Sequence, residues 1–276
     1  MSTDLDGERA HLAYESVNLS VWRATRHLRG ARILDVGCGT GALAHRLTQL
    51  GNHVEGVTHS SAEAAIARDR MEAVHLVDLD APERLFDIID LSSFDAVILA
   101  GVLEHLQDPV RVLRTLGPAL DRGVPVYVSL PNIACWYIRL GLLAGRFQPR
   151  DDGILDRTHL HHYTLSTARE MLAEAGLTVD WMDVTPSFSV WFYSHFVKAA
   201  ASEPNRPRAE RADFAFYERW VFPVERVPTV MWKRMLANEI MYAARRGTTP
   251  VPRYGSAARW RPALAGRRMA GWHRGD

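Results

Sequence analysis

One short run constrains the fold of this 276-residue chain more than any other: Ile33-Leu34-Asp35-Val36-Gly37-Cys38-Gly39-Thr40-Gly41. It predicts an apolar strand directly before three glycines at alternate positions, and a helix directly after them. Glycines permit positive φ and let the backbone approach a ligand closely, and a helix start offers N–H groups without helical partners. This geometry suits a nucleoside with a polar tail. Dinucleotide enzymes place G-x-G-x-x-G at the same point, whereas the spacing here is G-x-G-x-G behind an aspartate.

Beyond this run, short apolar segments alternate with segments that carry apolar residues at helical spacing. Such alternation is typical of a mostly parallel sheet with helices on both faces. We therefore predict an α/β, doubly wound, mostly parallel seven-stranded sheet with an inserted helical and aromatic accessory region. The strands are predicted at 32–36, 54–58, 74–77, 96–99, 124–130, 177–183 and 238–245, and the helices at 11–29, 42–50, 61–70, 110–120 and 165–175.

The chain is predicted to contain one principal domain with additions, because its length and its 47% hydrophobic residues suffice for one sizeable core. The aromatic segment 188–222 needs an apolar partner, which is an acceptor molecule, a second copy in a homodimer, or the core itself. We assign residues 1–183 to a core with an N-terminal helix, 184–236 to a helical lid or accessory insertion, 237–246 to the last core strand, and 247–276 to an arginine-rich, loosely ordered tail.

Charge and cysteine content argue against several function classes. The 33 basic and 32 acidic residues give a formal charge of +1, so neither nucleic acid nor an anionic membrane is indicated as a partner. Cys38 and Cys135 lie far apart in the sequence, and a disulfide would distort the glycine-rich turn around Cys38, which favours a reducing compartment. No stretch reaches about 18 uncharged apolar residues, and residues 1–10 lack the apolar region of a signal peptide. We therefore expect a cytoplasmic protein without a membrane span.

The run Asp35-Val36-Gly37-Cys38-Gly39-Thr40-Gly41 resembles motif I of the class I S-adenosylmethionine-dependent methyltransferases, which have a Rossmann-like fold. The resemblance extends from about residue 12 to 183 and implies S-adenosyl-L-methionine as the cofactor. The further segments are similar to a subgroup of polysaccharide and natural-product methyltransferases: Tyr14-Glu15, Val102-Leu103-Glu104-His105-Leu106, Ser129-Leu130-Pro131-Asn132 and Gly153-Ile154-Leu155-Asp156-Arg157-Thr158-His159-Leu160.

The resemblance also implies which residues bind the cofactor. In the subgroup, the aspartate and glycines of the first strand hold the methionine part, the end of the second strand holds the ribose, and an aspartate after the third strand holds the adenine amine. The implied cofactor-binding residues of this chain are Tyr14, Asp35, Gly37, Cys38, Gly39, Gly41, Thr58, His59, Glu63, Asp78, Leu79, Ala100 and Gly101.

Thr58 departs from this pattern, since most relatives have a carboxylate there, which can accept hydrogen bonds from both ribose hydroxyls. The turn Gly56-Val57-Thr58-His59-Ser60 is similar to that of cyclopropane-fatty-acid synthases and certain N-methyltransferases, which place a glutamine five residues beyond the threonine. Glu63 has that position here. We predict that Glu63 supplies the missing acceptor; the alternative is an exposed acid favoured by the helix dipole.

Methyl transfer needs an in-line nucleophile, a dry pocket, and a base if the nucleophile is a hydroxyl or a protonated amine. In this fold the acceptor is expected near the carboxyl ends of the fourth and fifth strands. We predict His159, His105 and Asp156 as catalytic residues, with His159 as the base; the alternative for each histidine is a structural role. His159, His161 and His162 also suggest zinc, but no carboxylate–cysteine set completes a tetrahedral site, and we predict no metal.

The predicted function is methyl transfer to a hydroxyl or carboxyl oxygen of a small molecule or glycosylated metabolite in natural-product biosynthesis. The alternatives are an N-methyltransferase that acts on a small-molecule amine and a non-catalytic S-adenosylmethionine-binding scaffold protein. RNA methylation would need a basic face with interleaved aromatic residues, which the charge balance does not favour. The acceptor itself is not encoded by local motifs, because acceptor pockets in this fold are built from variable elements.

Overall fold

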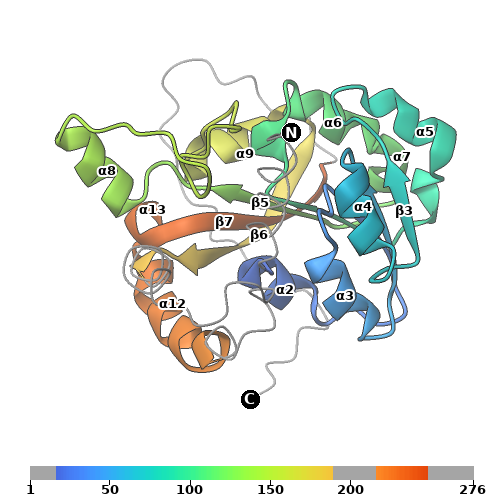
Figure 1. The fold of residues 1–276 in the computed structure, drawn as a ribbon, viewed down its shortest axis with the longest axis horizontal. Helices are drawn as coiled ribbons and strands as arrows, with labels where there is room; N and C mark the ends of the chain where they lie inside the picture. Colours follow the sequence, from blue (N-terminus) through green and yellow to red (C-terminus); the bar gives the residue numbers. More distant parts are fainter. Residues whose placement is uncertain (1–16, 189–215, 248–276) are drawn as a thin grey trace, which may run out of the picture.

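The computed structural model describes residues 17–188 and 216–247. Within these ranges one sheet runs through the molecule and has helices on both faces (Figure 1). Its strand order is β3-β2-β1-β4-β5-β7-β6. Neighbouring strands pair in parallel except β7, which is antiparallel to both β5 and β6. The prediction of an α/β, mostly parallel seven-stranded sheet is confirmed.

The strands begin and end close to their predicted positions: β1 (Arg32–Val36), β2 (His53–Thr58), β3 (Ala73–Leu76), β4 (Ala96–Ala100), β5 (Val126–Pro131), β6 (Leu177–Pro186) and β7 (Ala237–Arg246). The described α-helices are α2 (Leu19–Thr25), α3 (Ala42–Thr48), α4 (Ser61–Ala67), α5 (Leu85–Ile88), α6 (Pro109–Thr115), α7 (Gly117–Leu120), α8 (Trp136–Leu143), α9 (Leu165–Glu174), α12 (Phe222–Met231) and α13 (Lys233–Leu236). Tighter or wider turns form η1 (Pro82–Arg84), η2 (Leu91–Ser93), η3 (Leu103–His105) and the π-helical η7 (Tyr217–Val221).

Alternation along the central strands divides the core into two layers. Ile33 and Ile98 belong to one buried cluster, whereas their neighbours Leu34 and Val97 belong to the other. Successive side chains of a strand point to opposite faces, so a strand covered on both sides must be apolar at nearly every position. These four side chains are completely buried. The carboxyl ends of β1 and β4 are therefore held in place by packed side chains on both faces of the sheet.

Of the predicted helix 11–29, residues 11–16 lie outside the described residues, and the described part contains the shorter helix α2. The segment 11–29 is not one continuous helix, because Asn18 has extended backbone and caps α2 by accepting hydrogen bonds from the N–H groups of Ser20 and Val21. Its side chain thereby satisfies donors that a helix start leaves unpaired. At the other end α2 stops at Thr25, not at residue 29.

Two further helical segments also differ from their prediction. The segment 110–120 is divided at Leu116 into α6 and α7, because Pro118 lacks an N–H group and its ring interferes with a continuous helix. The connection 131–164 contains α8, which the sequence did not predict. Leu142 and Leu143 of α8 are exposed, so its apolar residues do not follow the period of a buried helix face.

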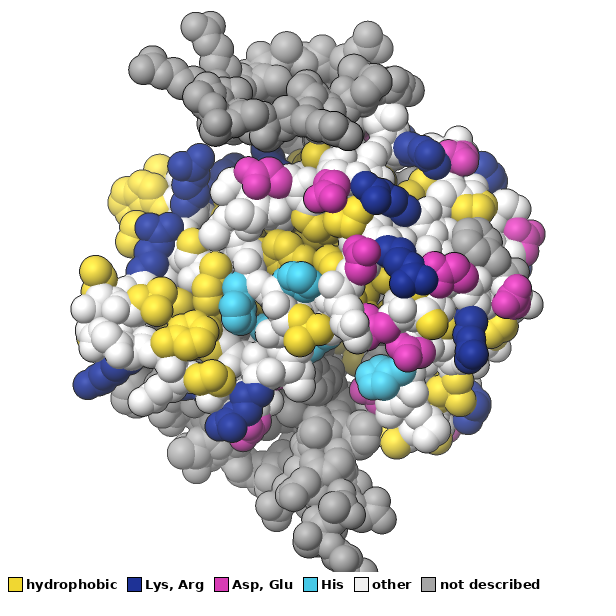
Figure 2. Space-filling model, turned by 90° about the horizontal axis from the view of Figure 1, so that it is seen from above, with side chains coloured by type: hydrophobic (Ala, Val, Ile, Leu, Met, Phe, Trp, Pro, Cys, Tyr) yellow, Lys and Arg dark blue, Asp and Glu magenta, His cyan; other side chains and the backbone are white. Residues whose placement is uncertain are grey.

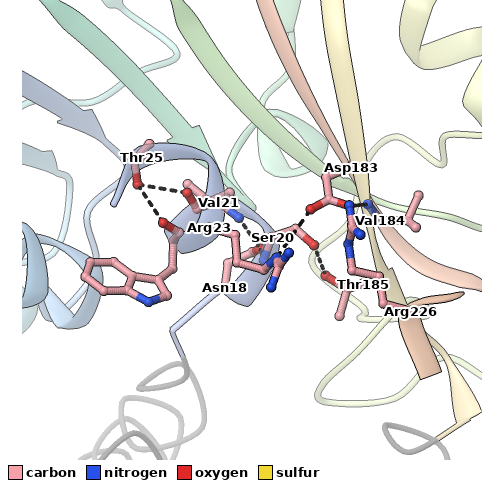
Figure 3. A network of polar contacts seen from close by, with 10 residues as sticks. Asn18, Ser20, Val21, Arg23, Thr25, Asp183, Val184, Thr185 and Arg226 are labelled. Carbon is pink, nitrogen blue, oxygen red and sulfur yellow. Dashed lines mark hydrogen bonds and ion pairs between the residues drawn. The ribbon is translucent and has the colours of Figure 1, made fainter. Parts of the chain in front are cut away.

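A buried aspartate fastens two helices to β6, as Figure 3 shows. The side chain of Asp183 is 1% exposed and accepts hydrogen bonds from the guanidinium of Arg226 on α12, at 2.8 Å from Nε and 2.7 Å from Nη2. Nε of Arg23 on α2 lies 3.8 Å from the second carboxylate oxygen. Removing one partner of a buried ion pair leaves an uncompensated charge. Asp183 therefore fixes α2 and α12 on the same strand.

The two ends of the segment between β6 and β7 lie next to each other. The backbone N–H of Ser187 donates to the carbonyl of Leu236 at 2.9 Å. The predicted last strand, 238–245, is confirmed as β7. Most of the aromatic segment 188–222 and the tail beyond residue 247 lie outside the described residues, so the division into domains stays a prediction. In the described part of the chain, no helix has the length and hydropathy to cross a membrane.

Candidate active site

The glycine turn connects the carboxyl end of β1 to α3. The N–H groups of Gly37 and Cys38 both donate to the carbonyl of Val57, at 2.8 and 2.9 Å, which ties the turn to β2. Gly37 and Gly39 have φ of 76° and 52°, in the region that favours glycine. A Cβ on Gly37 would approach Val102 to 2.6 Å, whereas one on Gly39 would meet no atom within 4 Å. The backbone at Gly39 therefore faces open space.

At the end of β2, Glu63 turns back toward the strand. The buried Thr58 donates its hydroxyl to Oε2 of Glu63 at 2.6 Å. The N–H of Glu63 donates to the hydroxyl of Ser60, which caps α4. The half-buried carboxylate of Glu63 thus belongs to the strand end, as expected if it completes the site, and its role toward a ribose stays a prediction.

Asp35 and Asp78 differ in their surroundings. Asp35 on β1 is buried, and desolvation raises the pKa of its carboxyl to about 7. Asp78 follows β3 and is exposed, with Oδ1 accepting a hydrogen bond from the N–H of Asp80 at 2.9 Å. A buried carboxylate is costly unless it gains a cationic or hydrogen-bonding partner. The position of Asp35 is therefore suited to a cationic ligand group.

The other predicted cofactor residues also follow or end the central strands. They are the exposed His59 after β2, the buried Leu79 after β3, the half-buried Ala100 at the end of β4, Gly101 with a φ of 67°, and Gly41, which opens α3 with a φ of 80°. Tyr14 lies outside the described residues.

The loop that carries His159 folds back onto η3. The N–H groups of Leu160 and His161 both donate to the carbonyl of Glu104, at 2.8 and 3.1 Å. As a result, the ring centroids of His105 and His159 lie 4.7 Å apart, with an angle of 72° between the ring planes. The fold therefore brings together two histidines that the sequence places in separate segments.

Hydrogen bonds hold both rings of this histidine pair. Nδ1 of His105 lies 3.0 Å from the hydroxyl of Thr158, which itself donates to Oδ1 of the buried Asp156 at 2.7 Å. Nδ1 of His159 lies 3.1 Å from the carbonyl oxygen of Ile154. A carbonyl can only accept, so Nδ1 of His159 carries a proton and Nε2 of the neutral ring keeps its lone pair. Thus all three predicted catalytic residues belong to one cluster.

Burial lowers the pKa of both His105 and His159. For His105, the negative charge of Asp156 opposes this effect; for His159, the neighbouring ring of His105 adds to it. Burial also raises the pKa of Glu104 to about 8. At neutral pH both imidazoles are therefore largely neutral and able to accept a proton.

Glu104, His105 and His159 also place one donor atom each within 4.8 Å of one another, a separation at which a metal ion could be held. Oε2 of Glu104 is buried without a hydrogen-bond partner. Three donors fall short of the four that close a structural zinc site, although two histidines and one glutamate are also a ligand set of catalytic zinc sites. The expectation of no metal stays a prediction.

Figure 2 shows histidine side chains near the middle of one face of the molecule, beside a group of hydrophobic side chains, with most acidic and basic side chains farther out. Three residues of the candidate site were not identified from the sequence as site residues. Thr158 and Glu104 were noted only within matching segments, and their contacts depend on the fold. Gly56 carried a usable signal, since glycine inside a strand indicates close approach; a Cβ there would lie 2.7 Å from Sγ of Cys38.

Comparisons with known proteins agree with this geometry. Residues 11–180 match the family described as methyltransferase domain. A ubiquinone biosynthesis O-methyltransferase of Xanthomonas oryzae pv. oryzae (strain PXO99A) is 32% identical over 167 residues, which cover 58% of this chain and 66% of the relative. The chain thus spans slightly less than two thirds of the length of that relative, and 55% of the length of another from Xanthomonas campestris pv. campestris (strain B100).

Solved structures are similar at the level of the fold. A SAM dependent methyltransferase from Archaeoglobus fulgidus has a TM-score of 0.55 at 15% identity, covering 88% of this chain and 100% of that one. The 4+2 cyclase SpnF has a TM-score of 0.52 at 21% identity, covering 82% and 79%. A shared fold does not by itself fix the reaction. The family match over residues 11–180, together with the glycine turn and the strand order, identifies this chain as a member of the class I S-adenosylmethionine-dependent methyltransferases.

Proposed function

We propose that this chain transfers a methyl group from S-adenosylmethionine to a hydroxyl or carboxyl oxygen of a small molecule or glycosylated metabolite. The observation that carries the proposal is the pair of His105 and His159, two imidazoles 4.7 Å apart beside η3, which follows β4. The name of the relatives, ubiquinone biosynthesis O-methyltransferase, supports oxygen as the acceptor atom. A place in natural-product biosynthesis, a cytoplasmic location and a homodimer through 188–222 stay predictions.

The residues at the glycine turn fit this cofactor. The open space at Gly39 lets a ligand lie against the backbone. The buried carboxyl of Asp35 suits the ammonium group of the methionine part, and Glu63, held by Thr58, suits the ribose hydroxyls. Asp78 would accept from the adenine amine. When bound, the cofactor supplies an electrophilic methyl group on its sulfonium.

The histidine pair supplies what a hydroxyl acceptor needs. Such an acceptor must lose its proton while its oxygen forms the new bond to carbon. A neutral imidazole beside the acceptor takes that proton on Nε2. A carboxylate acceptor has no proton to lose, so it would depend on the pair only for orientation.

Labelled cofactor and a panel of acceptors test the proposal. We expect the purified full chain to transfer the methyl label to a phenol, sugar hydroxyl or carboxylate. For hydroxyl acceptors, His105→Ala combined with His159→Ala should lower kcat by roughly 10²–10⁴ and leave the affinity for S-adenosylhomocysteine unchanged by calorimetry. His53→Ala is the control, because this exposed histidine pairs with Glu72 outside the site.

Two results would replace the proposal. Transfer to amines alone would identify an N-methyltransferase. Tight binding of S-adenosylhomocysteine without transfer to any acceptor of the panel would favour the scaffold protein.

A further inference from the structure

We infer that Thr158 is a positioning residue that selects His105, and not His159, as the histidine that takes the acceptor's proton. The inference rests on the proposed function, because it requires a hydroxyl acceptor. It is carried by the hydrogen bonds that join Asp156, Thr158 and His105, and by their contrast with the hydrogen bond of His159 to a backbone carbonyl.

The direction of the hydrogen bond between Thr158 and His105 follows from the single proton of the Thr158 hydroxyl. Both the N–H and the hydroxyl of Thr158 point at the same oxygen of Asp156, at 2.8 and 2.7 Å. A hydroxyl has one proton to donate, so only its lone pairs are left for Nδ1 of His105, 3.0 Å away. That nitrogen must therefore be the donor. The neutral His105 ring then carries its proton on Nδ1 and keeps the lone pair on Nε2.

The same tautomer is present in His159, but its partner is different. Nδ1 of His159 donates to the neutral carbonyl of Ile154. When His105 gains a proton on Nε2, the positive ring is linked through one hydroxyl to the carboxylate of Asp156, whose charge is the largest opposing influence on its pKa. When His159 gains one, its hydrogen-bond partner is a carbonyl; the charge of Asp156 also raises the pKa of His159, but less than burial and the neighbouring His105 lower it. An opposite charge favours the charged form of a group. The positive charge is therefore better accommodated on His105.

The other charged groups near His105 do not reverse this preference. His159 is the ring in edge contact with it, and His59 is close enough to lower the pKa of His105 slightly when charged. Glu104 is buried with a pKa of about 8, so it is mostly neutral at pH 7 and provides little negative charge. Asp156 is therefore the acid that stabilises a positive His105.

During transfer, the O–H bond of the acceptor breaks and its proton goes to Nε2 of His105. The electron pair of that bond stays on the oxygen, from which the bond to the methyl carbon forms. No proton moves along the chain: Nδ1 of His105 keeps its proton toward Thr158, and the hydroxyl of Thr158 keeps its proton toward Asp156. Thr158 and Asp156 act only by orienting the ring and stabilising its charge.

Thr158→Val and Thr158→Ser form a matched pair, because valine keeps the shape without the hydroxyl and serine keeps the hydroxyl. For a hydroxyl acceptor, Thr158→Val should lower kcat by about 10–100-fold, as loss of the polar partner of a histidine does at metal sites, with KM almost unchanged. The acid limb of the pH profile of kcat should move to lower pH, because the protonated His105 ring loses its link to Asp156 and its pKa falls. Thr158→Ser should restore both, and His105→Gln should reduce kcat more than His159→Gln. A larger loss for His159→Gln, or a Thr158→Val enzyme with normal kcat, would overturn the inference.

Nitrogen NMR of the histidines in the protein without cofactor separates this inference from the proposed function. We expect the Nδ1–H tautomer of His105 in the wild type and in Thr158→Ser, and a mixture of tautomers in Thr158→Val. An Nε2–H tautomer in the wild type would overturn the inference even if methyl transfer occurs. The expected tautomers in a protein that methylates no acceptor would uphold the positioning by Thr158 and refute the proposed function.

Discussion

The two halves of the candidate site are encoded in different ways. The part of the cofactor half that is proposed to hold the methionine and the ribose is contained in one stretch of chain, from Asp35 near the end of β1 to Glu63 at the start of α4. The acceptor half joins η3 to a distant loop, since His105 and Thr158 are 53 positions apart. Local rules of turns and caps shape the first half, whereas the second exists only after the chain has folded. Changes in the first half should therefore affect cofactor binding, and changes in the second should affect the chemical step.

Gly39→Val should give the largest effect on the cofactor half. A side chain there fills the space in front of the backbone, so binding of S-adenosylhomocysteine should weaken by more than about 150-fold in calorimetry, as an overpacked contact of about 3 kcal/mol or more would cause. Gly51→Val is a matched control, because Gly51 also has positive φ and open space around its Cα but lies after α3. Equal affinity in both variants would mean that the cofactor does not contact this turn.

Glu63→Ala should give an intermediate effect. The loss of a charged hydrogen-bond acceptor costs about 1.5–3 kcal/mol, which corresponds to about 10–150-fold weaker binding of S-adenosylhomocysteine. Glu63→Gln keeps a carbonyl that can accept from a ribose hydroxyl, so its loss should be smaller. Glu72→Ala removes an exposed acid outside the site and should bind normally. If Glu63→Ala also binds normally, the contact with Thr58 serves only the fold.

Asp35 should affect stability, and its effect should be visible as a pH dependence of the free energy of unfolding. Its pKa is about 7 in the folded protein and 3.8 as the ordinary value. Between these values the folded protein holds a proton that the unfolded chain has released. The free energy of unfolding should therefore fall as pH rises from about 4 to 7, by at most about 1.4 kcal/mol per pH unit.

Denaturant titrations at pH 5 and pH 7 measure this contribution of Asp35. Asp35→Asn removes the titrating group, so the variant should gain stability relative to the wild type as pH rises. If the free energies of unfolding of the two proteins differ by the same amount at both pH values, ionisation of Asp35 does not destabilise the folded protein.

Much of the fold could be predicted because the central strands are buried on both faces. In β1 and β4, apolar side chains occupy nearly every position, which gave the strand boundaries within one or two residues. The place of β7 between β5 and β6 depends on pairing between distant segments and leaves no local pattern. The helix α8 was missed for a different reason: its leucines are exposed, so periodicity does not mark a buried face.

The parts of the candidate site that are formed by residues close together in the sequence could be predicted, and the parts that the fold brings together could not. Glycines at alternate positions and a capped helix start are readable in the sequence, and Glu63 was proposed because related turns place a glutamine five residues after the threonine. The contact between His105 and Thr158 requires the backbone bonds from Leu160 and His161 to Glu104, which no local pattern specifies. The resemblance to known methyltransferases pointed to two histidines and an aspartate, and the contacts in the fold indicate which atom of each ring carries the proton.

Ser187 and Leu236 close the segment between β6 and β7 with a backbone hydrogen bond. A loop whose ends already meet can gain or lose residues at a cost that rises only slowly with its length. Recombination can therefore exchange this segment for one of another size while the sheet and the glycine turn remain as they are, provided that the new segment keeps an arginine opposite the buried Asp183. For protein engineering, these two residues mark the junctions at which new segments could be grafted onto an unchanged cofactor-binding framework.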